Sequence, residues 1–412
     1  MRFFKYFTAI FFIVFPILSH AEYGKLYGVN IHANKYNMSA DNVLLKIKNT
    51  GFNSYRQEIS WNSVEQEKGN YNINGKNIIK DEIINESSKY NIEPILILSY
   101  GNDLYDGGEF PIKKESLNGY VNYARWIAER YKGKVNKYEI WNEWTLGTGM
   151  KDKKNIPDEQ YYLQLVRQTS KALKLIDPNI KVIAGSFNPL SKTGRRLKHN
   201  DMQWFENLIN MGILDYIDGI SIHPYSFLNP DIKARAVEEN FNYLEYLQRE
   251  IQTASNKKRE FPIYITEAGL SNFEGPGGVE QIVSSDFIVK YTAMISTLSY
   301  VKGVWWYDLI DDGDNKNEKE DNFGFYTYNL QKKVVVDNFF KLMSFLYAHQ
   351  MNNCQVIIQS SVVRFAQKDS SKVDECEKIQ WERLPLMQFN RVTGAFNHCN
   401  DCNKIGGINS GK

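Results

Sequence analysis

The feature that most constrains the fold is a regular alternation of short apolar runs with longer amphipathic stretches between residues 22 and 349. Each run is bounded by Gly, Pro, Asn or Asp, as expected of a buried parallel strand. The eight runs are Leu26–His32, Ser54–Ile59, Pro94–Ser99, Val135–Trp141, Ile180–Ala184, Ile217–His223, Ile263–Thr266 and Gly303–Leu309. Eight strands that each precede a helical stretch predict an α/β protein of the TIM-barrel type, a (β/α)8 fold.

The stretches between the runs have helical spacing. In the clearest one, which begins after Pro157, apolar residues recur every three or four positions until Asp177-Pro178 ends the helix. An open, doubly wound sheet is the structural alternative. No GxGxxG or Walker loop follows any of the runs, however, so the sequence favours the barrel.

The N-terminus has the pattern of an export signal. Arg2 and Lys5 precede an apolar run from Tyr6 to Leu18, and Ser19-His20-Ala21 follows as a small-x-small cleavage site. The run is about thirteen residues long, which is short for a membrane-spanning helix, although an uncleaved anchor is the alternative. We expect residues 1–21 to be a signal peptide and the mature protein to be periplasmic or secreted, with no membrane anchor.

The net charge restricts the class of partner. Cleavage after Ala21 removes two cations and no acids, so the formal charge falls from +2 to 0. A neutral chain has no electrostatic reason to bind nucleic acid or anionic membranes. We therefore expect no nucleic acid among the partners of this chain, and we expect a monomer.

The C-terminal extension, residues 350–412, contains all four cysteines of the chain, Cys354, Cys376, Cys399 and Cys402. In an exported protein these predict disulfides, with three possible pairings. Zinc is the alternative, although Cys399-Asn-Asp-Cys402 is a single CxxC motif. The extension is too short for a second large core, so either cross-link belongs to the extension and not to the barrel.

Two glutamates follow the fourth and seventh predicted strands, Glu143 in the segment Tyr138–Trp144 and Glu267 in Ile263–Gly269. The C-terminal ends of barrel strands carry the catalytic groups of TIM-barrel enzymes, so both side chains are expected at one rim. Strands four and seven lie on opposite sides of a barrel. Their carboxylates can therefore face each other across a sugar, at the separation of about 5 to 5.5 Å that retaining glycoside hydrolysis requires. A solvated loop position is the alternative for each glutamate.

These motifs resemble a known group. Trp141-Asn142-Glu143 with Thr266-Glu267 is similar to the signature of clan A retaining glycoside hydrolases. Within that clan, residues 25–345 look most like family 39 and its bacterial exopolysaccharide-hydrolase relatives, with family 5 next. The resemblance implies that Glu143 is the acid/base, Glu267 the nucleophile and Asn142 the partner of the sugar 2-hydroxyl.

The resemblance also implies supporting residues. Arg56 would support the nucleophile, Tyr225 would hydrogen-bond to it, and His223 would lie close by. Trp306, rather than Trp305, would form the floor of the reacting sugar's subsite, with Asp308 on the same face. The alternatives from the residues themselves are a structural pair of Arg56 with Glu58 and a core histidine at position 223.

Trp144 and His32 complete the predicted site. Trp144 stands where many relatives have Pro, which suggests an extra aromatic platform. His32, at the tip of strand one, is expected to face the site. Glu143 has no cationic partner in the motifs and lies near a second carboxylate, so a raised pKa is expected for its side chain.

No metal or cofactor is expected. Strand one offers only His32 and no His-x-His pair, which disfavours a metal-dependent barrel hydrolase. The acidic segment Asp311–Asp314 lacks the ligand spacing of an EF-hand, so a solvated loop is favoured, with calcium as the alternative.

The sequence thus predicts an endo-β-glycosidase that cleaves a secreted or cell-surface polysaccharide with retention. A transglycosylase with the same two glutamates and a non-catalytic carbohydrate-binding barrel are the alternatives.

Overall fold

The structure is a computed structural model that describes residues 24–348, apart from 192–199, 230, 232 and 256–259. Beyond them it describes four short strands, which pair as two antiparallel hairpins: β11 (Cys354–Gln359) with β12 (Val362–Gln367), and β13 (Met387–Phe389) with β14 (Phe396–His398). The expected signal peptide and the side chains of the four cysteines lie outside the described residues.

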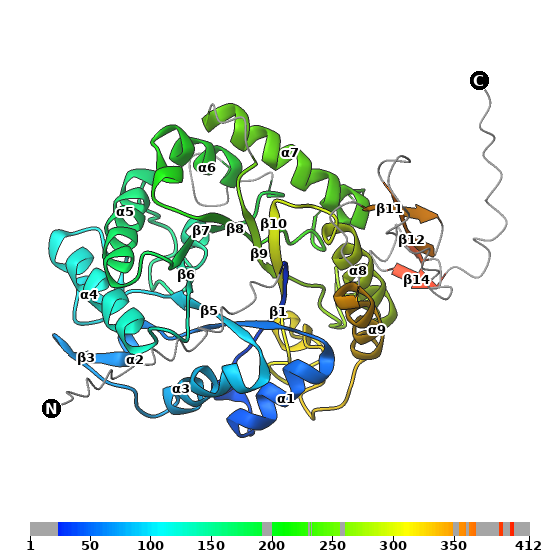
Figure 1. Ribbon diagram of the computed structural model, residues 1–412, viewed down its shortest axis with the longest axis horizontal. Helices are drawn as coiled ribbons and strands as arrows, with labels where there is room; N and C mark the ends of the chain where they lie inside the picture. The colour runs from blue at the N-terminus through cyan, green and yellow to red at the C-terminus, as the bar shows by residue number, and fades with distance from the viewer. Residues whose placement is uncertain are drawn as a thin grey trace, which may run out of the picture.

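The central feature is a closed barrel of eight parallel strands in the order β1-β10-β9-β8-β7-β6-β5-β2 (Figure 1). The strands are β1 (Leu26–Asn30), β2 (Ser54–Glu58), β5 (Glu93–Leu98), β6 (Lys137–Ile140), β7 (Lys181–Phe187), β8 (Gly219–Ile222), β9 (Ile263–Ala268) and β10 (Val301–Trp306). All eight coincide with the predicted runs, so the TIM-barrel prediction is confirmed.

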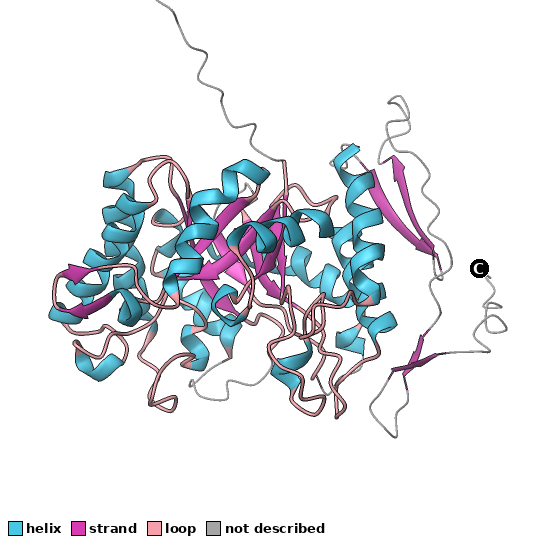
Figure 2. Ribbon diagram, turned by 90° about the horizontal axis from the view of Figure 1, so that it is seen from below, coloured by secondary structure: helices cyan, strands magenta, loops and turns pink. Residues whose placement is uncertain are grey.

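A layer of helices surrounds the strands (Figure 2). One long helix follows each barrel strand: α1 (Ala40–Thr50), α3 (Asn77–Glu86), α4 (Lys114–Arg130), α5 (Glu159–Ile176), α6 (Asp201–Asn210), α7 (Val237–Ser255), α8 (Gln281–Ile295) and α9 (Val334–Ala348). A short helix α2 (Trp61–Val64) and the hairpin of β3 (Glu65–Glu67) with β4 (Asn70–Tyr71) lie between β2 and α3.

The apolar core has two parts because side chains of a strand alternate between its faces. A large cluster fills the space between strands and helices, and a small one of Leu26, Ile95, Ile183, Tyr264 and Trp305 fills the barrel interior. Gly28 makes room for the indole of Trp305, since a Cβ added at Gly28 would lie 2.1 Å from that ring.

Two strands interrupt this alternation near their C-terminal ends. Between Ile265 and Ala268, β9 has one residue more than the facing segment of β10, and β7 has one more than β8 between Gly185 and Phe187. An extra residue of this kind turns the following side chains toward a different face. Both irregularities lie at the C-terminal rim and therefore change what points into the barrel mouth.

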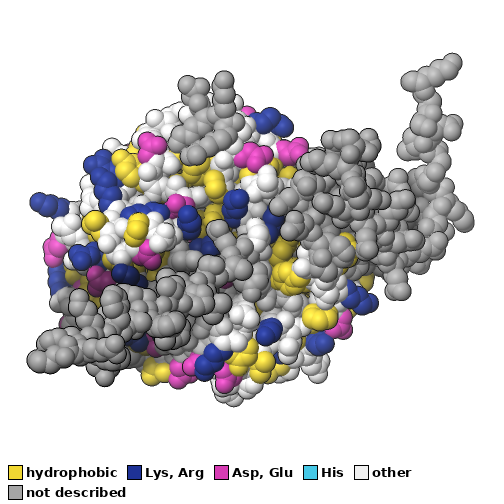
Figure 3. Space-filling view, viewed as in Figure 1, with side chains coloured by type: hydrophobic (Ala, Val, Ile, Leu, Met, Phe, Trp, Pro, Cys, Tyr) yellow, Lys and Arg dark blue, Asp and Glu magenta, His cyan; other side chains and the backbone are white. Residues whose placement is uncertain are grey.

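The described surface carries charges of both signs. On the face seen in Figure 3, acidic and basic side chains are interspersed. Among the described residues, no helix combines the length and the apolar character needed to cross a membrane.

The packing of Trp305 against Gly28 yields a test of stability. Gly28→Ala should lower the free energy of unfolding by about 1–3 kcal/mol, because the added methyl group forces the buried indole to move. Urea unfolding followed by tryptophan fluorescence measures the change. Gly24→Ala is the matched control, since its added Cβ meets no atom within 4 Å. Equal stability of the two variants would contradict this description of the barrel interior.

Candidate active site

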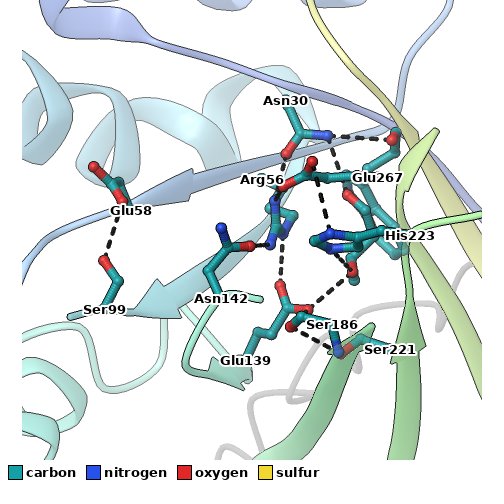
Figure 4. Close-up of polar contacts among 12 residues, drawn as sticks. Asn30, Arg56, Glu58, Ser99, Glu139, Asn142, Ser186, Ser221, His223 and Glu267 are labelled. Atoms are coloured by element: carbon teal, nitrogen blue, oxygen red, sulfur yellow. Dashed lines mark hydrogen bonds and ion pairs between the residues drawn. The ribbon is translucent and has the colours of Figure 1, made fainter. Parts of the chain in front are cut away.

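The C-terminal mouth of the barrel is organised around one buried arginine, Arg56 of β2 (Figure 4). Its Nε donates to Glu139 Oε2 and its Nη1 to Glu267 Oε1, both at 2.6 Å. Nη1 also donates to Asn30 Oδ1 and Nη2 to Asn142 Oδ1, both at 2.8 Å. The guanidinium thus joins side chains from β1, β2, β9 and the end of β6.

The charge of this arginine is fixed by its surroundings. Burial by itself lowers the pKa of Arg56, but the adjacent carboxylates of Glu139 and Glu267 outweigh burial and raise it. A permanent cation therefore lies between two buried carboxylates.

Glu267 lies at the mouth because of the extra residue in β9. Thr266 points into the barrel and contacts Glu139. In a regular strand the next side chain would face the helices, but the irregular register lets Glu267 also point inward and reach Arg56. Tyr225, which follows β8, donates its hydroxyl proton to Glu267 Oε2 at 3.0 Å. One oxygen of Glu267 is thus held by a cation and the other by a hydroxyl group.

Glu143 is held by an unusual backbone. Trp141 and Glu143 both have left-handed conformations, with φ of 66° and 49°. Such conformations cost about 1–3 kcal/mol each in a non-glycine residue and persist only where packing enforces them. Trp141 is fully buried and stacks on Phe110, which anchors the turn. The turn directs Glu143 across the mouth, where Thr148 donates its hydroxyl proton to Glu143 Oε2 at 2.8 Å.

The two glutamates meet at a shared histidine. Nδ1 of His223 lies 3.2 Å from Glu143 Oε1 and 3.7 Å from Glu267 Oε2. One oxygen of each glutamate and one nitrogen of His223 all lie within 4.8 Å of one another. The structure therefore brings together six predicted site residues, which are Arg56, Asn142, Glu143, His223, Tyr225 and Glu267.

The expectation of a raised pKa for Glu143 is wrong. Burial by itself raises this pKa, but the hydrogen bond and the positive charge of His223 outweigh burial and lower it. Burial lowers the pKa of His223, and the charges of Glu267 and Glu143 reverse that effect and raise it. The motifs gave Glu143 no partner because His223 is eighty positions away in the chain and meets it only in the folded barrel.

The hydrogen bonds fix the tautomer of His223. The Thr266 hydroxyl donates its single proton to Glu139 Oε1 at 2.9 Å, so it can only accept from His223 Nε2, which lies 3.1 Å away. Nε2 therefore carries a proton in both charge states of the ring. Nδ1 is the nitrogen that titrates, and it faces both glutamates.

Sequence reasoning missed three members of this site, Asn30, Glu139 and Thr148, and the role of Thr266 as a hydrogen-bond acceptor. Glu139 is the most consequential, because it is a fully buried acid in an apolar strand. Such an acid requires a cationic partner, and that signal could have identified it. The alternative pair of Arg56 with Glu58 is wrong, since Glu58 instead accepts a hydrogen bond from Ser99 at 3.1 Å.

Two predicted aromatic contacts with the ligand are also wrong. Trp306 points away from the mouth toward α8, where its indole N–H donates to Thr292 and its ring packs edge-on against Tyr291. Trp305 enters the barrel interior and donates to Ser54, so neither tryptophan of β10 floors the mouth. Trp144 is buried among aromatic rings and donates to the carbonyl of Pro157, because the left-handed turn at Glu143 directs it beneath the loop.

His32 lies at the rim but contacts a different group of residues. Its Nδ1 is 2.7 Å from Asp312 Oδ1 and 3.7 Å from Asp308 Oδ2. Among the described residues, this cluster and the triad of Glu143, His223 and Glu267 are the two groups with donor atoms close enough to hold a metal ion. In the triad, Arg56, Tyr225, Thr148 and Thr266 already satisfy the donors and acceptors, so it suits proton transfer and charge stabilisation.

The chain matches known protein families. The family model for glycosyl hydrolases family 39 matches residues 120–393, and the model for glycosyl hydrolase family 1 matches residues 18–152. The first match covers more than half of the chain.

Solved structures have the same fold. A family 39 glycoside hydrolase from the gut symbiont Bacteroides cellulosilyticus WH2 is 22% identical, with a TM-score of 0.66 over 85% of this chain and 69% of that one. A GH5_18 protein from Streptomyces cattleya, in complex with Manb1-4GlcNAc, is 12% identical, with a TM-score of 0.61 over 78% and 80%. A family 1 β-glucosidase from Thermotoga maritima is 16% identical, with a TM-score of 0.55 over 79% and 97%.

The tautomer of His223 can be tested directly. In protein labelled with 15N-histidine, a long-range 1H–15N correlation spectrum should show that Nε2 keeps its proton while Nδ1 titrates. His223→Asn assigns the signals. Thr266→Val removes the acceptor and should allow the other neutral tautomer to appear. A neutral wild-type ring with its proton on Nδ1 would show that the hydrogen-bond assignment is wrong.

Proposed function

Because the chain belongs to glycosyl hydrolase family 39 and is an O-glycosyl hydrolase, we propose that it cleaves a β-linked glycan with retention of configuration. Glu267 acts as the nucleophile and Glu143 as the acid/base. The observation that carries this proposal is the approach of the two carboxylates to within 4.8 Å at one mouth of the barrel. Retention requires a separation of about 5–5.5 Å, whereas inversion leaves room for a water molecule between the groups.

In the first step, Glu267 attacks the anomeric carbon while a proton moves from Glu143 to the departing oxygen, which leaves as an alcohol. In the second step, Glu143 takes a proton from water, and the resulting oxygen nucleophile displaces Glu267 and restores its carboxylate. Arg56 donates to one oxygen of Glu267 and Tyr225 to the other, so both hold the carboxylate in place for its attack on the anomeric carbon.

The charges of the site suit a cationic transition state. When the imidazole of His223 is neutral and the carboxylate of Glu143 is ionised, the pair carries a charge of −1. One more proton, held by either residue, makes the pair neutral as a whole. Arg56 then offsets one of the two remaining carboxylates, Glu139 and Glu267. Together, the five groups carry a net charge of about −1, which favours the positive charge that develops on the sugar ring. They are Glu143, His223, Arg56, Glu139 and Glu267.

The substrate proposal rests on two supports. The neighbouring structures are named for β-linked sugars, Manb1-4GlcNAc and a β-glucosidase among them. The expected signal peptide favours a polysaccharide outside the cytoplasm. Sizing of the products from a panel of β-linked polysaccharides separates internal from terminal cleavage, and an added acceptor sugar reveals transglycosylation.

The two glutamates should differ in how their loss is repaired. Glu267→Ala should reduce turnover of every substrate by at least about 10⁴-fold, because no glycosyl-enzyme can form. Glu143→Ala should still form the glycosyl-enzyme from a 2,4-dinitrophenyl glycoside, whose leaving group needs no proton, and azide should restore its turnover.

The control for these two variants is Glu280→Ala, which changes an exposed glutamate whose side chain makes no capping hydrogen bond at the start of α8 and which should behave as wild type. The two roles would have to be exchanged if azide rescued Glu143→Ala poorly and Glu267→Ala retained activity on the activated substrate.

The shared proton predicts how the pH profile changes. Activity requires one proton on the Glu143–His223 pair. When two sites can hold the same proton, the pKa for its loss from the pair is at least as high as the pKa of either site alone. His223→Asn should therefore move the alkaline limb of kcat/KM to lower pH, on the order of one unit. Of the two glutamates, Tyr225 hydrogen-bonds only to Glu267. Tyr225→Phe should therefore lower kcat without moving the alkaline limb. An alkaline limb that moves upward in His223→Asn contradicts proton sharing.

A further inference from the structure

A second cluster of side chains lies at the same rim, between β1 and β10. These strands are neighbours in the barrel, with Val29 opposite Trp306. His32 follows β1, and Asp308 and Asp312 follow β10. One donor atom from each of these three residues lies within 4.8 Å of the other two. None of them contacts Glu143 or Glu267 through a hydrogen bond that the structure records, so the cluster is not used by the proposed reaction.

Asp308 is the unexplained member of the cluster. Its side chain is fully buried, yet neither of its carboxylate oxygens has a hydrogen-bond partner among the described residues. Buried polar groups are nearly always satisfied, and a buried charge requires a counter-ion. A proton on Asp308 would remove the charge but would leave a buried hydroxyl without an acceptor.

The charges around Asp308 are also out of balance. Lys333 Nζ lies 2.7 Å from Asp311, and Lys35 Nζ lies 2.7 Å from Asp312. Each lysine offsets one acid. Among the described cationic side chains, only His32 approaches Asp308 within 4 Å, at 3.7 Å. One further positive charge at this position would satisfy both the charge and the unpartnered oxygens.

We propose that His32 Nδ1, Asp308 and Asp312 bind one divalent first-row transition-metal ion at the rim. An imidazole nitrogen with two carboxylates suits Mn²⁺ or Zn²⁺, whereas Ca²⁺ prefers six to eight oxygen ligands. The ion replaces the proton between His32 and Asp312, and water completes its coordination. It ties the loop after β1 to the loop after β10, and β10 is the neighbour of the strand that carries Glu267.

Binding of Mn²⁺ to the full chain tests the proposal. Mn²⁺ is the appropriate probe because it binds oxygen and nitrogen ligands in preference to the soft sulfur ligands that cysteine residues offer. Electron paramagnetic resonance of free Mn²⁺ should show one ion bound per chain. Asp308→Asn and His32→Ala should each weaken that binding at least tenfold. His32 is partly exposed, so its variant keeps the test valid if Asp308→Asn fails to fold.

Two controls locate the ion. Asp314→Asn changes an exposed acid of the same loop, and Glu143→Gln changes the other candidate cluster; both should bind Mn²⁺ as wild type does. The proposal is overturned by an absence of saturable Mn²⁺ binding. It is equally overturned if binding survives Asp308→Asn and His32→Ala or disappears in Glu143→Gln.

Discussion

The pairing of Arg56 with Glu139 and Glu267 is the constraint on which the rest of the site depends. All three side chains are largely removed from water, and the guanidinium lies 2.6 Å from each carboxylate. Removal of one partner from a buried ion pair costs about 3–5 kcal/mol, because it leaves the other charge uncompensated. The same contacts therefore join the C-terminal ends of β2, β6 and β9 across the mouth of the barrel. Stability of the barrel rim and the positioning of Glu267, the proposed nucleophile, therefore have one physical origin.

This arrangement separates two chemically identical glutamates by their partners. Glu267 is held by a permanent cation on one carboxylate oxygen and by a hydroxyl group on the other. Glu143 faces a titratable imidazole, so its proton belongs to a pair and not to one residue. Glu139 contributes from a distance: it fixes the Thr266 hydroxyl, which fixes the His223 ring with Nδ1 toward the reaction. A buried acid that does not contact Glu143 thus helps to decide which nitrogen of His223 faces the two glutamates.

Strand order and motif position were sufficient to predict the barrel and the six residues gathered at its mouth, because parallel strands bring their C-terminal ends to one rim. The errors are of three kinds: a side chain assigned to the wrong face of its strand, a turn of the backbone, and a partner that is distant in the chain. Trp306 follows strict alternation and faces the helices, whereas the extra residue in β9 turns Glu267 inward. Trp144 is buried by a backbone turn that propensities do not reveal. The pKa of Glu143 depends on His223, a contact that exists only after folding.

The most direct test of the account is capture of the glycosyl-enzyme. A 2-deoxy-2-fluoro glycoside of the cleaved sugar, with a 2,4-dinitrophenolate leaving group, forms the intermediate quickly and releases it slowly. Peptide mass spectrometry of the inactivated protein should place a single sugar on Glu267. A label on Glu143, or fresh product of inverted configuration with no labelled peptide, would contradict the proposal that Arg56 holds the nucleophile of a retaining enzyme.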